Sequence, residues 1–386
     1  MAHILMAGVG AHGHVYPHLP VIAELIERGH RVTYAIPNSF AEIVASTGAA
    51  PLVHTSVLPD QSRGQQWPTD VVEGVSLFLN EAIQALPQIT AALDRDRPSA
   101  VLYDIGGYCG HVLARRWQLP LVQLSPAMVA WDGMERDLGE ALAFRRTRQY
   151  ARYEAQFAAW LTAQGIDCDV DTFAGRPPRC AVLIPRAMQP HVDRVDESVY
   201  TFVGPSLDRR AHQGQWPSSD RPLVLVSLGS AYTNRPAFFR DCITAFAPLG
   251  YQVVLAIGSR IDPTDLGELP PNVEAHRWVP QLAVLQRARA FVTHAGMGGC
   301  CEGLYAGVPM IAVPQAVDQF GNAALLEQLG VAVHLPLDAA TPKALRHALL
   351  CLVESVEVAD RLAALRKEVR AAGGAIVAAD MIEAQL

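Results

Sequence analysis

Residues 3–36 read HILMAGVGAHGHVYPHLPVIAELIERGHRVTYAI and decide the fold of the first half of the chain. An aliphatic run at each end predicts a strand, and between the runs lie a glycine-rich loop and a segment with apolar residues at helical spacing. Pro17 suits the first turn of that helix, and Gly29 suits the position just past its end. The stretch therefore predicts a strand–helix–strand unit, which builds parallel sheets covered by helices on both faces.

The second half of the chain begins with the same plan. Residues 223–258 predict a strand, a small-residue loop, a helix over 235–250 and a second strand. The segment 204–222 is rich in Gly, Pro, Ser and charge, which is typical of a connection. Further strands are predicted at 51–56, 100–104, 121–125, 272–279, 290–296 and 309–315. We expect an α/β protein with domains over 1–207 and 223–370, a linker over 208–222, and a closing helix over 371–386 that can pack back on the first domain.

Bulk composition narrows the class of protein. The chain has 386 residues, half of them hydrophobic, and a net charge of −7, which argues against nucleic acid or an anionic membrane as the main partner. Its seven cysteines are scattered without a CxxC pair, which is typical of reduced thiols in the cytoplasm. No apolar run reaches the roughly 18 residues of a membrane span. We expect a cytoplasmic protein without a transmembrane segment.

The opening loop carries the GxGxxG pattern of dinucleotide-binding proteins in Gly8, Gly10 and Gly13. That site also needs an acidic residue after the second strand to bind the ribose, but the strand is followed by Pro37 and Asn38. A sharp turn of the backbone explains the glycines equally well. The sequence thus disfavours a nicotinamide-dependent oxidoreductase.

Three histidines in the same loop suggest a metal site, yet no acidic residue lies nearby to complete one. We expect Pro17 to place His14 and His18 on either side of a helix start, and His18 to be a capping or turn residue. His14 follows the first strand, and Asp104 ends the predicted fourth strand, where such sheets have their crevice. A hydrogen bond donated by one ring nitrogen of His14 to the Asp104 carboxylate would leave the other nitrogen able to accept a proton. The alternative is that Asp104 only caps the next helix.

The chemistry of residues 278–322, WVPQLAVLQRARAFVTHAGMGGCCEGLYAGVPMIAVPQAVDQFGN, suits a nucleotide sugar. Trp278 can stack on a base, and Glu302 follows shortly after the turn 294–299. That turn exposes backbone amides at a helix start, and such amides bind phosphates.

This block resembles the donor-binding signature of the family-one UDP-glycosyltransferases: W-x-P-Q, T-H-x-G, a Glu, G-V-P, and an acidic residue followed by Gln. The opening HGHVYP resembles their acceptor motif, and the likeness extends over essentially the whole chain. It is most similar to the macrolide glycosyltransferases of actinomycetes. The resemblance implies a GT-B fold, in which two Rossmann-like, doubly wound parallel-sheet domains face each other across a cleft, with the acceptor on the first domain and the UDP-sugar on the second.

By this resemblance, His14 would be the general base and Asp104 its orienting partner. Trp278 would stack on uracil beside Val279 and Gln281, and Glu302 would bind the ribose hydroxyls. The remaining donor residues would be Ser230, His294, Gly296, Gly298 and Gly299 at the diphosphate, with Asp318 and Gln319 at the sugar. Plant members carry Asn-Ser where this chain has Gly298-Gly299. Phosphate binding here would therefore depend more on backbone amides than on side chains.

The acceptor side is predicted to be apolar. Between residues 57 and 80, which bear on the acceptor, the stretch SVLPDQSRGQQWPTDVV (56–72) has turn composition and includes Trp67, which predicts a mobile loop over the acceptor. The other expected wall residues follow strands, and ordinary core packing is the alternative for each: Ile105, Tyr108, Ser125, Met128, Trp131 and Ala231. Such a wall suits a bulky lipophilic acceptor.

The expected reaction is inverting transfer of glucose from UDP-glucose to a hydroxyl of a macrolide, which would inactivate the antibiotic. A phenolic or flavonoid acceptor, a TDP-deoxysugar donor, or a catalytically silent nucleotide-sugar binding protein are the alternatives. We expect no metal and no cofactor, because the Asp-x-Asp strings at 94–96 and 167–169 do not follow aliphatic strands and suit solvated turns. A monomer or a homodimer is expected.

Overall fold

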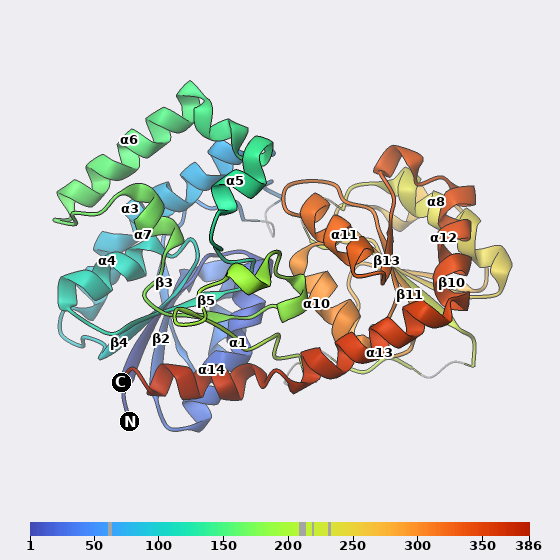
Figure 1. Cartoon of the computed structure of the whole chain (residues 1–386). Coiled ribbons are helices and arrows are strands. Elements are labelled where there is room, and N and C mark those ends of the chain that lie inside the picture. The colour runs from blue at the N-terminus through green and yellow to red at the C-terminus, as the bar shows by residue number, and fades with distance from the viewer. Residues whose placement is uncertain (61–63, 208–213, 218–219, 231–232) are drawn as a thin grey trace. The chain divides into compact units, whose positions relative to one another are not determined.

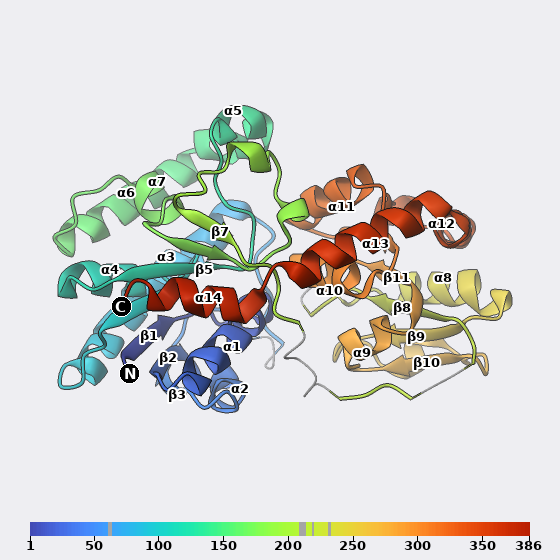
Figure 2. The same ribbon diagram turned by 60° about the horizontal axis from the view of Figure 1, so that its bottom comes forward.

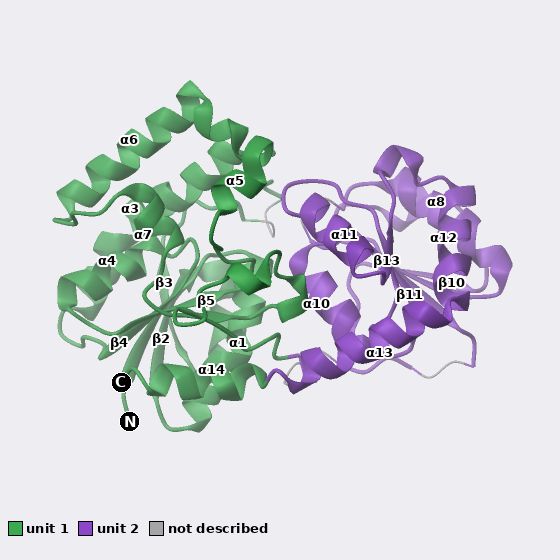
Figure 3. Ribbon diagram, in the orientation of Figure 1, with its two compact units in different colours: residues 1–206, 373–386 green, residues 207–372 purple. Residues whose placement is uncertain are grey.

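The computed structural model describes residues 1–60, 64–207, 214–217, 220–230 and 233–386 (Figure 1). The chain forms two compact units (Figure 3). Unit 1 consists of Met1–Ser206 and Gly373–Leu386, and unit 2 consists of Leu207–Ala372. Across the described ranges, none of the helices combines the length and the apolar character needed to cross a membrane.

Unit 1 contains a seven-stranded sheet in the order β3-β2-β1-β4-β5-β6-β7, in which every pair of neighbours is parallel. The strands are β1 (His3–Ala7), β2 (Arg31–Pro37), β3 (Ala50–His54), β4 (Ala100–Asp104), β5 (Leu121–Ser125), β6 (Cys180–Val182) and β7 (Tyr200–Phe202). Because β1 pairs with both β2 and β4, the chain changes direction along the sheet between β1 and β4. In open parallel sheets this switch point is where ligands bind.

Helices cover both faces of this sheet, as the alternation of side chains along β1 requires. Ile4 and Met6 pack toward α1 (His12–Glu27) and α14 (Gly374–Glu383). Leu5 and Ala7 pack on the opposite face, where the core includes residues of α3 (Val71–Leu93), α4 (Tyr108–Trp117), α6 (Arg148–Ala163) and α7 (Val170–Gly175). The doubly wound arrangement predicted for the first half is confirmed.

The last helix belongs to unit 1. Ala378, Ala379 and Ile382 of α14 are buried in the core beside α1 (Figure 2). Arg28, just past the end of α1, donates hydrogen bonds to Asp380 and Glu383 at 2.6 Å each. The apolar contacts supply most of the stabilisation, because partly exposed ion pairs contribute little.

Helix α1 begins at His12, five residues before Pro17, so the glycine-rich loop is shorter than predicted. Pro17 and Pro20 both lie inside the helix, where each removes a backbone hydrogen bond. Tertiary contacts outweigh that cost: Val15 and His18 are completely buried, and the first turns of the helix pack on the sheet. The prediction that Pro17 marks the helix start was therefore wrong.

Unit 2 repeats the architecture with a six-stranded parallel sheet in the order β10-β9-β8-β11-β12-β13. Its switch point lies between β8 and β11. The strands are β8 (Leu223–Ser227), β9 (Gln252–Ala256), β10 (Val273–His276), β11 (Ala288–Thr293), β12 (Met310–Ala312) and β13 (Ala332–His334). The helices include α8 (Pro236–Phe246), α9 (Gln281–Leu285), α10 (Met297–Ala306), α11 (Gln319–Gln328), α12 (Pro342–Glu354) and α13 (Val356–Ala371).

Candidate active site

The switch point of unit 1 joins His14, in the first turn of α1, to Asp104, the last residue of β4. His14 Nδ1 lies 2.9 Å from Oδ1 and 3.0 Å from Oδ2 of Asp104. The Asp104 side chain is fully buried, whereas 22% of the His14 side chain is exposed. The pair therefore has one buried and one accessible member, which suits proton exchange with a bound ligand.

The ionisation of Asp104 determines the tautomer of His14. Burial by itself would raise the pKa of the Asp104 carboxyl, but the neighbouring His14 and His18 and the backbone N–H of Gly106 lower it below its usual value. An ionised carboxylate only accepts hydrogen bonds, so Nδ1 of His14 carries a hydrogen. In the neutral ring the lone pair then lies on Nε2.

His18 is not the capping or turn residue that the sequence predicted. It lies one helical turn after His14, on the same face of α1, and its Nε2 is 3.3 Å from Oδ2 of Asp104. The expectation that a helix start lies between His14 and His18 was also wrong, because α1 begins at His12, before both residues. Burial lowers the pKa of His18 to about 4, so the ring is neutral at physiological pH.

Structural contacts involve Gly10 and His12 of the opening segment. A Cβ atom on Gly10 would lie 2.7 Å from the Pro37 ring, so a close approach of the backbone requires this glycine. His12 stacks on Tyr16 at a centroid distance of 5.6 Å. Throughout the described ranges, no group of three or more His, Cys, Asp or Glu side chains is placed to hold a metal ion.

An aromatic row extends from His14 along unit 1. The His14 ring lies 6.2 Å from Phe78 of α3, and Phe78 lies 5.9 Å from the half-buried Trp67. A Cβ atom on Gly106 would lie 2.9 Å from Phe78, so this glycine lets α3 approach the turn after β4. Sequence analysis missed Phe78, and the Gly106-Gly107 pair was the available signal of a close approach there.

The other predicted acceptor residues divide into two groups. Ile105 and Met128 are half-buried on the turns after β4 and β5. Tyr108 and Ser125 are buried instead: Tyr108 packs in the core at 4.9 Å from Phe157, and Ser125 donates a hydrogen bond to the carbonyl of Ala127. Core packing thus describes Tyr108, while Ser125 shapes the turn.

Trp131 is also mostly buried, and it donates a hydrogen bond from Nε1 to Asp137 at 2.9 Å. Asp137 in turn accepts a hydrogen bond from Arg194, so the segment after β5 is tethered. Ala231 lies outside the described residues.

In unit 2, His294 lies directly after β11, at the switch point. A Cβ atom on Gly229 would be 2.5 Å from its ring, and one on Gly296 would also overlap it, so glycines on two loops enclose the imidazole. Burial lowers the pKa of His294 to about 4. Its Nδ1 has no hydrogen-bond partner among the residues that the structure describes.

Helix α10 starts at Met297, immediately after this loop, and its first turn carries Gly298 and Gly299. The first backbone N–H groups of a helix have no partner within it, and Gly298 is exposed with nothing within 4 Å of where a Cβ would lie. The described part of the Gly229 loop ends at Ser230, which is exposed. The amino end of α10 is therefore a bare backbone surface suited to an anion.

A second loop of unit 2 follows β12 and carries Asp318 and Gln319. Asp318 is exposed and accepts a hydrogen bond of 2.9 Å from Asn322, which also donates to the carbonyl of Ala295. Gln319 is buried, and its Oε1 accepts hydrogen bonds from the backbone of Gln315 and Ala316. Gln319 thus shapes the loop that presents Asp318.

Both loops hold a residue in a strained conformation. Ala295 (φ 60°) and Val317 (φ 46°) are two of the four non-glycine residues with positive φ in the described ranges. A β-branched residue seldom adopts this conformation, and such strain persists where the surrounding structure imposes it, often at a functional site.

The remaining predicted donor residues lie near the carboxyl end of β10 and on α10. Trp278 is 64% exposed, unusually so for its size, whereas Val279 is buried. Gln281 at the start of α9 donates a hydrogen bond of 2.6 Å from Nε2 to Oε2 of the buried Glu302. This bond orients the carboxylate.

The two Asp-x-Asp strings have structural partners. Asp96 accepts a hydrogen bond of 2.6 Å from Arg31, and Asp169 caps α7 by accepting from the backbone of Thr172 at 2.8 Å. Neither string lies at the switch point of unit 1.

The chain is similar to known proteins in both sequence and structure. Residues 179–368 match the family model "UDP-glucoronosyl and UDP-glucosyl transferase". Oleandomycin glycosyltransferase of Streptomyces antibioticus is 53% identical over 392 residues, which cover all of this chain and 91% of the relative. The chain belongs to this glycosyltransferase family.

Solved glycosyltransferases share the fold. The crystal structure of the glycotransferase of kitacinnamycin matches with a TM-score of 0.92 and 44% identity, over 100% of this chain and 99% of the other. CalG4, the calicheamicin glycosyltransferase, matches with a TM-score of 0.87 and 33% identity, over 100% and 98% of the two chains. The protein is thus a GT-B glycosyltransferase that takes a sugar nucleotide and a small-molecule acceptor.

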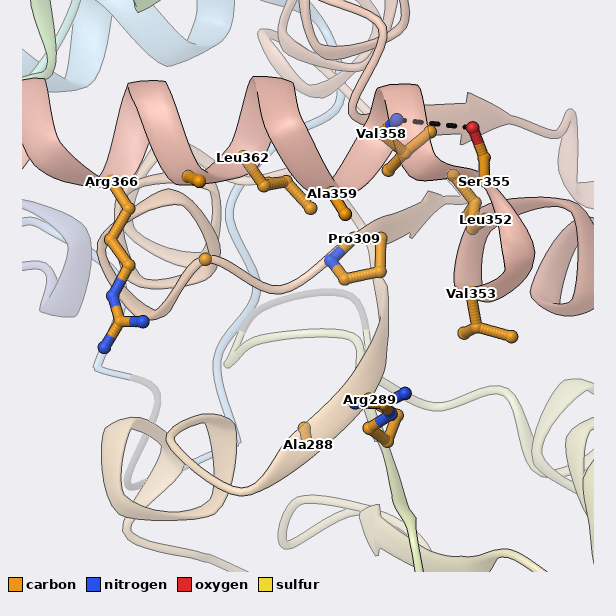
Figure 4. A pocket seen from close by; sticks show the side chains of 12 residues that line it. Ala288, Arg289, Pro309, Leu352, Val353, Ser355, Val358, Ala359, Leu362 and Arg366 are labelled. Atoms are coloured by element: carbon orange, nitrogen blue, oxygen red, sulfur yellow. Dashed lines mark hydrogen bonds between the residues drawn. The ribbon is translucent and has the colours of Figure 1, made fainter.

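The glycosyltransferase also has a cavity of about 300 Å³ in unit 2 (Figure 4). It is lined by residues of α12 and α13, among them Arg366, and by Arg289 and Pro309. Arg289 lies at the start of β11, and Pro309 directly precedes β12. These are the amino ends of strands whose carboxyl ends lead to His294 and Asp318. The cavity is therefore separate from the predicted donor residues.

Proposed function

We propose that this glycosyltransferase transfers glucose from UDP-glucose to a hydroxyl group of a macrolide or a similar lipophilic natural product, with inversion and without a metal ion. The observation that carries the proposal is the hydrogen bond between the accessible His14 ring and the buried Asp104 carboxylate. A pair of this kind activates an alcohol, which is a poor nucleophile at neutral pH.

In the proposed reaction, the acceptor O–H gives its proton to Nε2 of His14 as its oxygen bonds to the anomeric carbon. The bond between that carbon and the diphosphate oxygen breaks, and UDP leaves with the electron pair. Attack opposite to the leaving group turns an α-linked donor into a β-glycoside. Asp104 stabilises the imidazolium that forms, and general-base help of this kind is worth on the order of 10²–10⁴ in rate.

On the donor side, we propose that Trp278 stacks on the uracil and that Glu302, oriented by Gln281, binds the ribose hydroxyls. The amino end of α10, Ser230 and His294 would bind the diphosphate, with Gly296 shaping the loop. Preorganised N–H groups stabilise the charge that develops on the leaving group. We propose that Asp318 binds sugar hydroxyls, while Gln319 holds its loop in place through backbone contacts.

A lipophilic acceptor is supported by the side chains near His14. Phe78 and Trp67 extend from the His14 ring, and Ile105 and Met128 stand half-buried after the neighbouring strands. The name of the oleandomycin glycosyltransferase, 53% identical over the whole chain, supports a macrolide among lipophilic acceptors. Glycosylation would then inactivate the antibiotic.

The test is incubation of the purified protein with UDP-glucose and a panel of macrolides, followed by mass spectrometry. We expect one hexose to be added to at least one macrolide, and NMR of the product to show a β-linkage. Activity unchanged by EDTA is expected if no metal takes part. Turnover of flavonoids with no macrolide modified would contradict the acceptor class. Preference for a TDP-deoxysugar in a donor competition would contradict the proposed donor.

A further inference from the structure

A buried polar chain lies behind His14 and Asp104. The His18 ring is completely buried, and its Nε2 lies 3.3 Å from both the carbonyl oxygen of Leu124 and Oδ2 of Asp104. Its Nδ1 lies 3.2 Å from the hydroxyl of Tyr34, a residue of β2 that is also fully buried. Neither residue contributes to the reaction proposed above.

The partners of His18 fix the position of its hydrogen. A carbonyl oxygen only accepts hydrogen bonds, so the nitrogen beside Leu124 must be Nε2–H. Nδ1 then holds the lone pair and accepts from the Tyr34 hydroxyl, which keeps its hydrogen because burial raises its pKa well above the usual value. Tyr34 therefore selects the tautomer in which the hydrogen of His18 is on Nε2, which bonds to the Leu124 carbonyl and lies 3.3 Å from Oδ2 of Asp104.

Asp104 is held from several sides. Oδ1 is within reach of His14 Nδ1 at 2.9 Å and accepts from the backbone N–H of Gly106 at 3.1 Å. Oδ2 lies 3.0 Å from His14 and 3.3 Å from His18. The hydroxyls of Tyr34 and Tyr108, both buried and protonated, also act on this cluster. Of the two histidine contacts of Oδ2, the one with His14 would remain without His18.

We propose that His18 is a positioning residue for the transfer reaction: its Nε2–H, oriented by Tyr34 and donated to the Leu124 carbonyl, lies 3.3 Å from the second oxygen of Asp104 and by electrostatic attraction keeps the carboxylate aligned with His14. This inference rests on the proposed function of His14 as the base. The ring performs this role without a charge of its own, because burial keeps it neutral. A charged His18 would instead weaken the attraction between Asp104 and a protonated His14.

Loss of the His18 N–H should have two effects on catalysis. A less constrained carboxylate aligns His14 less well, and we expect kcat to fall about tenfold with the KM for UDP-glucose unchanged. The carboxylate also loses a donor that offsets its charge, so it favours protonated His14 more strongly. The acid limb of the kcat/KM profile should therefore move to higher pH.

The experiment compares His18→Phe, which removes the donor, with His18→Gln, which restores a side-chain N–H. We expect the shift of the acid limb in His18→Phe and its partial reversal in His18→Gln. Tyr34→Phe keeps the ring but frees the tautomer, so it should shift the limb in the same direction by less. His111→Phe is the matched control, because His111 is also buried and neutral in unit 1 but packs against Phe173.

Three outcomes would overturn the inference. The first is an acid limb unchanged in folded His18→Phe and Tyr34→Phe proteins, with folding checked by circular dichroism and thermal unfolding. The second is an equal shift in His111→Phe. The third is a full additional loss of kcat when His18→Phe is added to Asp104→Asn, because residues acting through one group are not additive. Failure of the proposed function is distinguishable, since it would appear as normal turnover in His14→Ala.

Discussion

The switch points of the two units use the same scaffold in opposite ways. In unit 1 the point between β1 and β4 holds buried and half-buried side chains, with His14 hydrogen-bonded to Asp104 and His18 Nε2 3.3 Å from the same carboxylate. In unit 2 the point between β8 and β11 holds glycines around His294 and a bare helix start. One site is built from side chains that can move a proton, and the other mainly from backbone amides that can bind an anion.

The difference has an electrostatic reason. A buried carboxylate loses its hydration, and it stays ionised only when neighbouring polar groups take the place of water. Around Asp104 this requires specific side chains, those of His14 and His18. A helix start already has unpaired N–H groups and a favourable dipole, and it needs only small residues so that a phosphate can approach. Gly298 and Gly299 meet that need. The same strand order therefore supports two chemistries because its loops differ.

The largest expected effect is the loss of the side-chain site in unit 1. His14→Ala should lower kcat by on the order of 10²–10⁴, because the acceptor hydroxyl loses its base, while UDP affinity stays unchanged. Turnover is measured by UDP release and affinity by calorimetry. His12→Ala is the matched control, since His12 is exposed and stacks on Tyr16. Full activity in His14→Ala would remove the contrast between the two units.

The next effect concerns a side chain in unit 2. Trp278→Ala should weaken UDP binding by roughly five- to a hundredfold, because a base stacked on an aromatic ring contributes about 1–3 kcal/mol. Trp278→Phe should lose less, and thermal stability should stay the same since the side chain is 64% exposed. Calorimetry with UDP measures the change. Equal affinities for all three proteins would show that the base binds elsewhere.

Acid should destabilise the protein through its buried histidines. His18 and His111 in unit 1 and His294 in unit 2 have pKa values lowered to about 4 by burial. The unfolded chain takes up these protons from about pH 6.5 downward, so the free energy of unfolding falls between that pH and about 4. Each histidine should cost about 2 kcal/mol between pH 7 and pH 5.

Urea unfolding of the full chain at the two pH values measures this loss. His111→Phe should remove about one histidine's share of it. The same pH dependence in His111→Phe and the unmodified protein would show that burial does not keep this ring neutral.

The smallest expected effect tests the backbone site in unit 2. Gly298→Ala should weaken UDP binding on the order of fivefold, because the added methyl would stand between the first N–H groups of α10 and a phosphate. The fold should tolerate it, since nothing lies within 4 Å of the new Cβ. Gly74→Ala, which is equally unobstructed in the first turns of α3, is the control. Unchanged affinity in Gly298→Ala would place the diphosphate away from this helix.

Prediction of the fold succeeded where strands were long and aliphatic. β1, β2, β4 and β5 in unit 1 and β8 and β11 in unit 2 were predicted at or close to their observed positions. The three-residue strands β6, β7 and β13 were not predicted, whereas β12, equally short, was found because it lies within the longer apolar run 309–315. Helix α1 starts earlier than predicted. The position of a proline in the sequence suggests a helix start, but it carries no information about the tertiary burial of Val15 and His18 that stabilises the earlier turn.

Prediction of the candidate site was less even. His14 and Asp104 were paired by reasoning from strand order, and the structure has them in hydrogen-bond contact. Phe78 was missed because its place depends on how α3 crosses the turn after β4. Tyr108 follows β4 as expected, but its side chain packs in the core, and Oε1 of Gln319 accepts hydrogen bonds from the preceding loop.

The sequence by itself determined the strand–helix alternation that builds two parallel sheets, because hydrophobic periodicity is a local property of the chain. It also determined the family, through motifs whose spacing survives without coordinates. Only the tertiary structure decided that His18 faces Asp104 and that Tyr34 orients it. Those contacts join residues from separate strands and a helix, and burial sets their protonation, so no local pattern of residues encodes them.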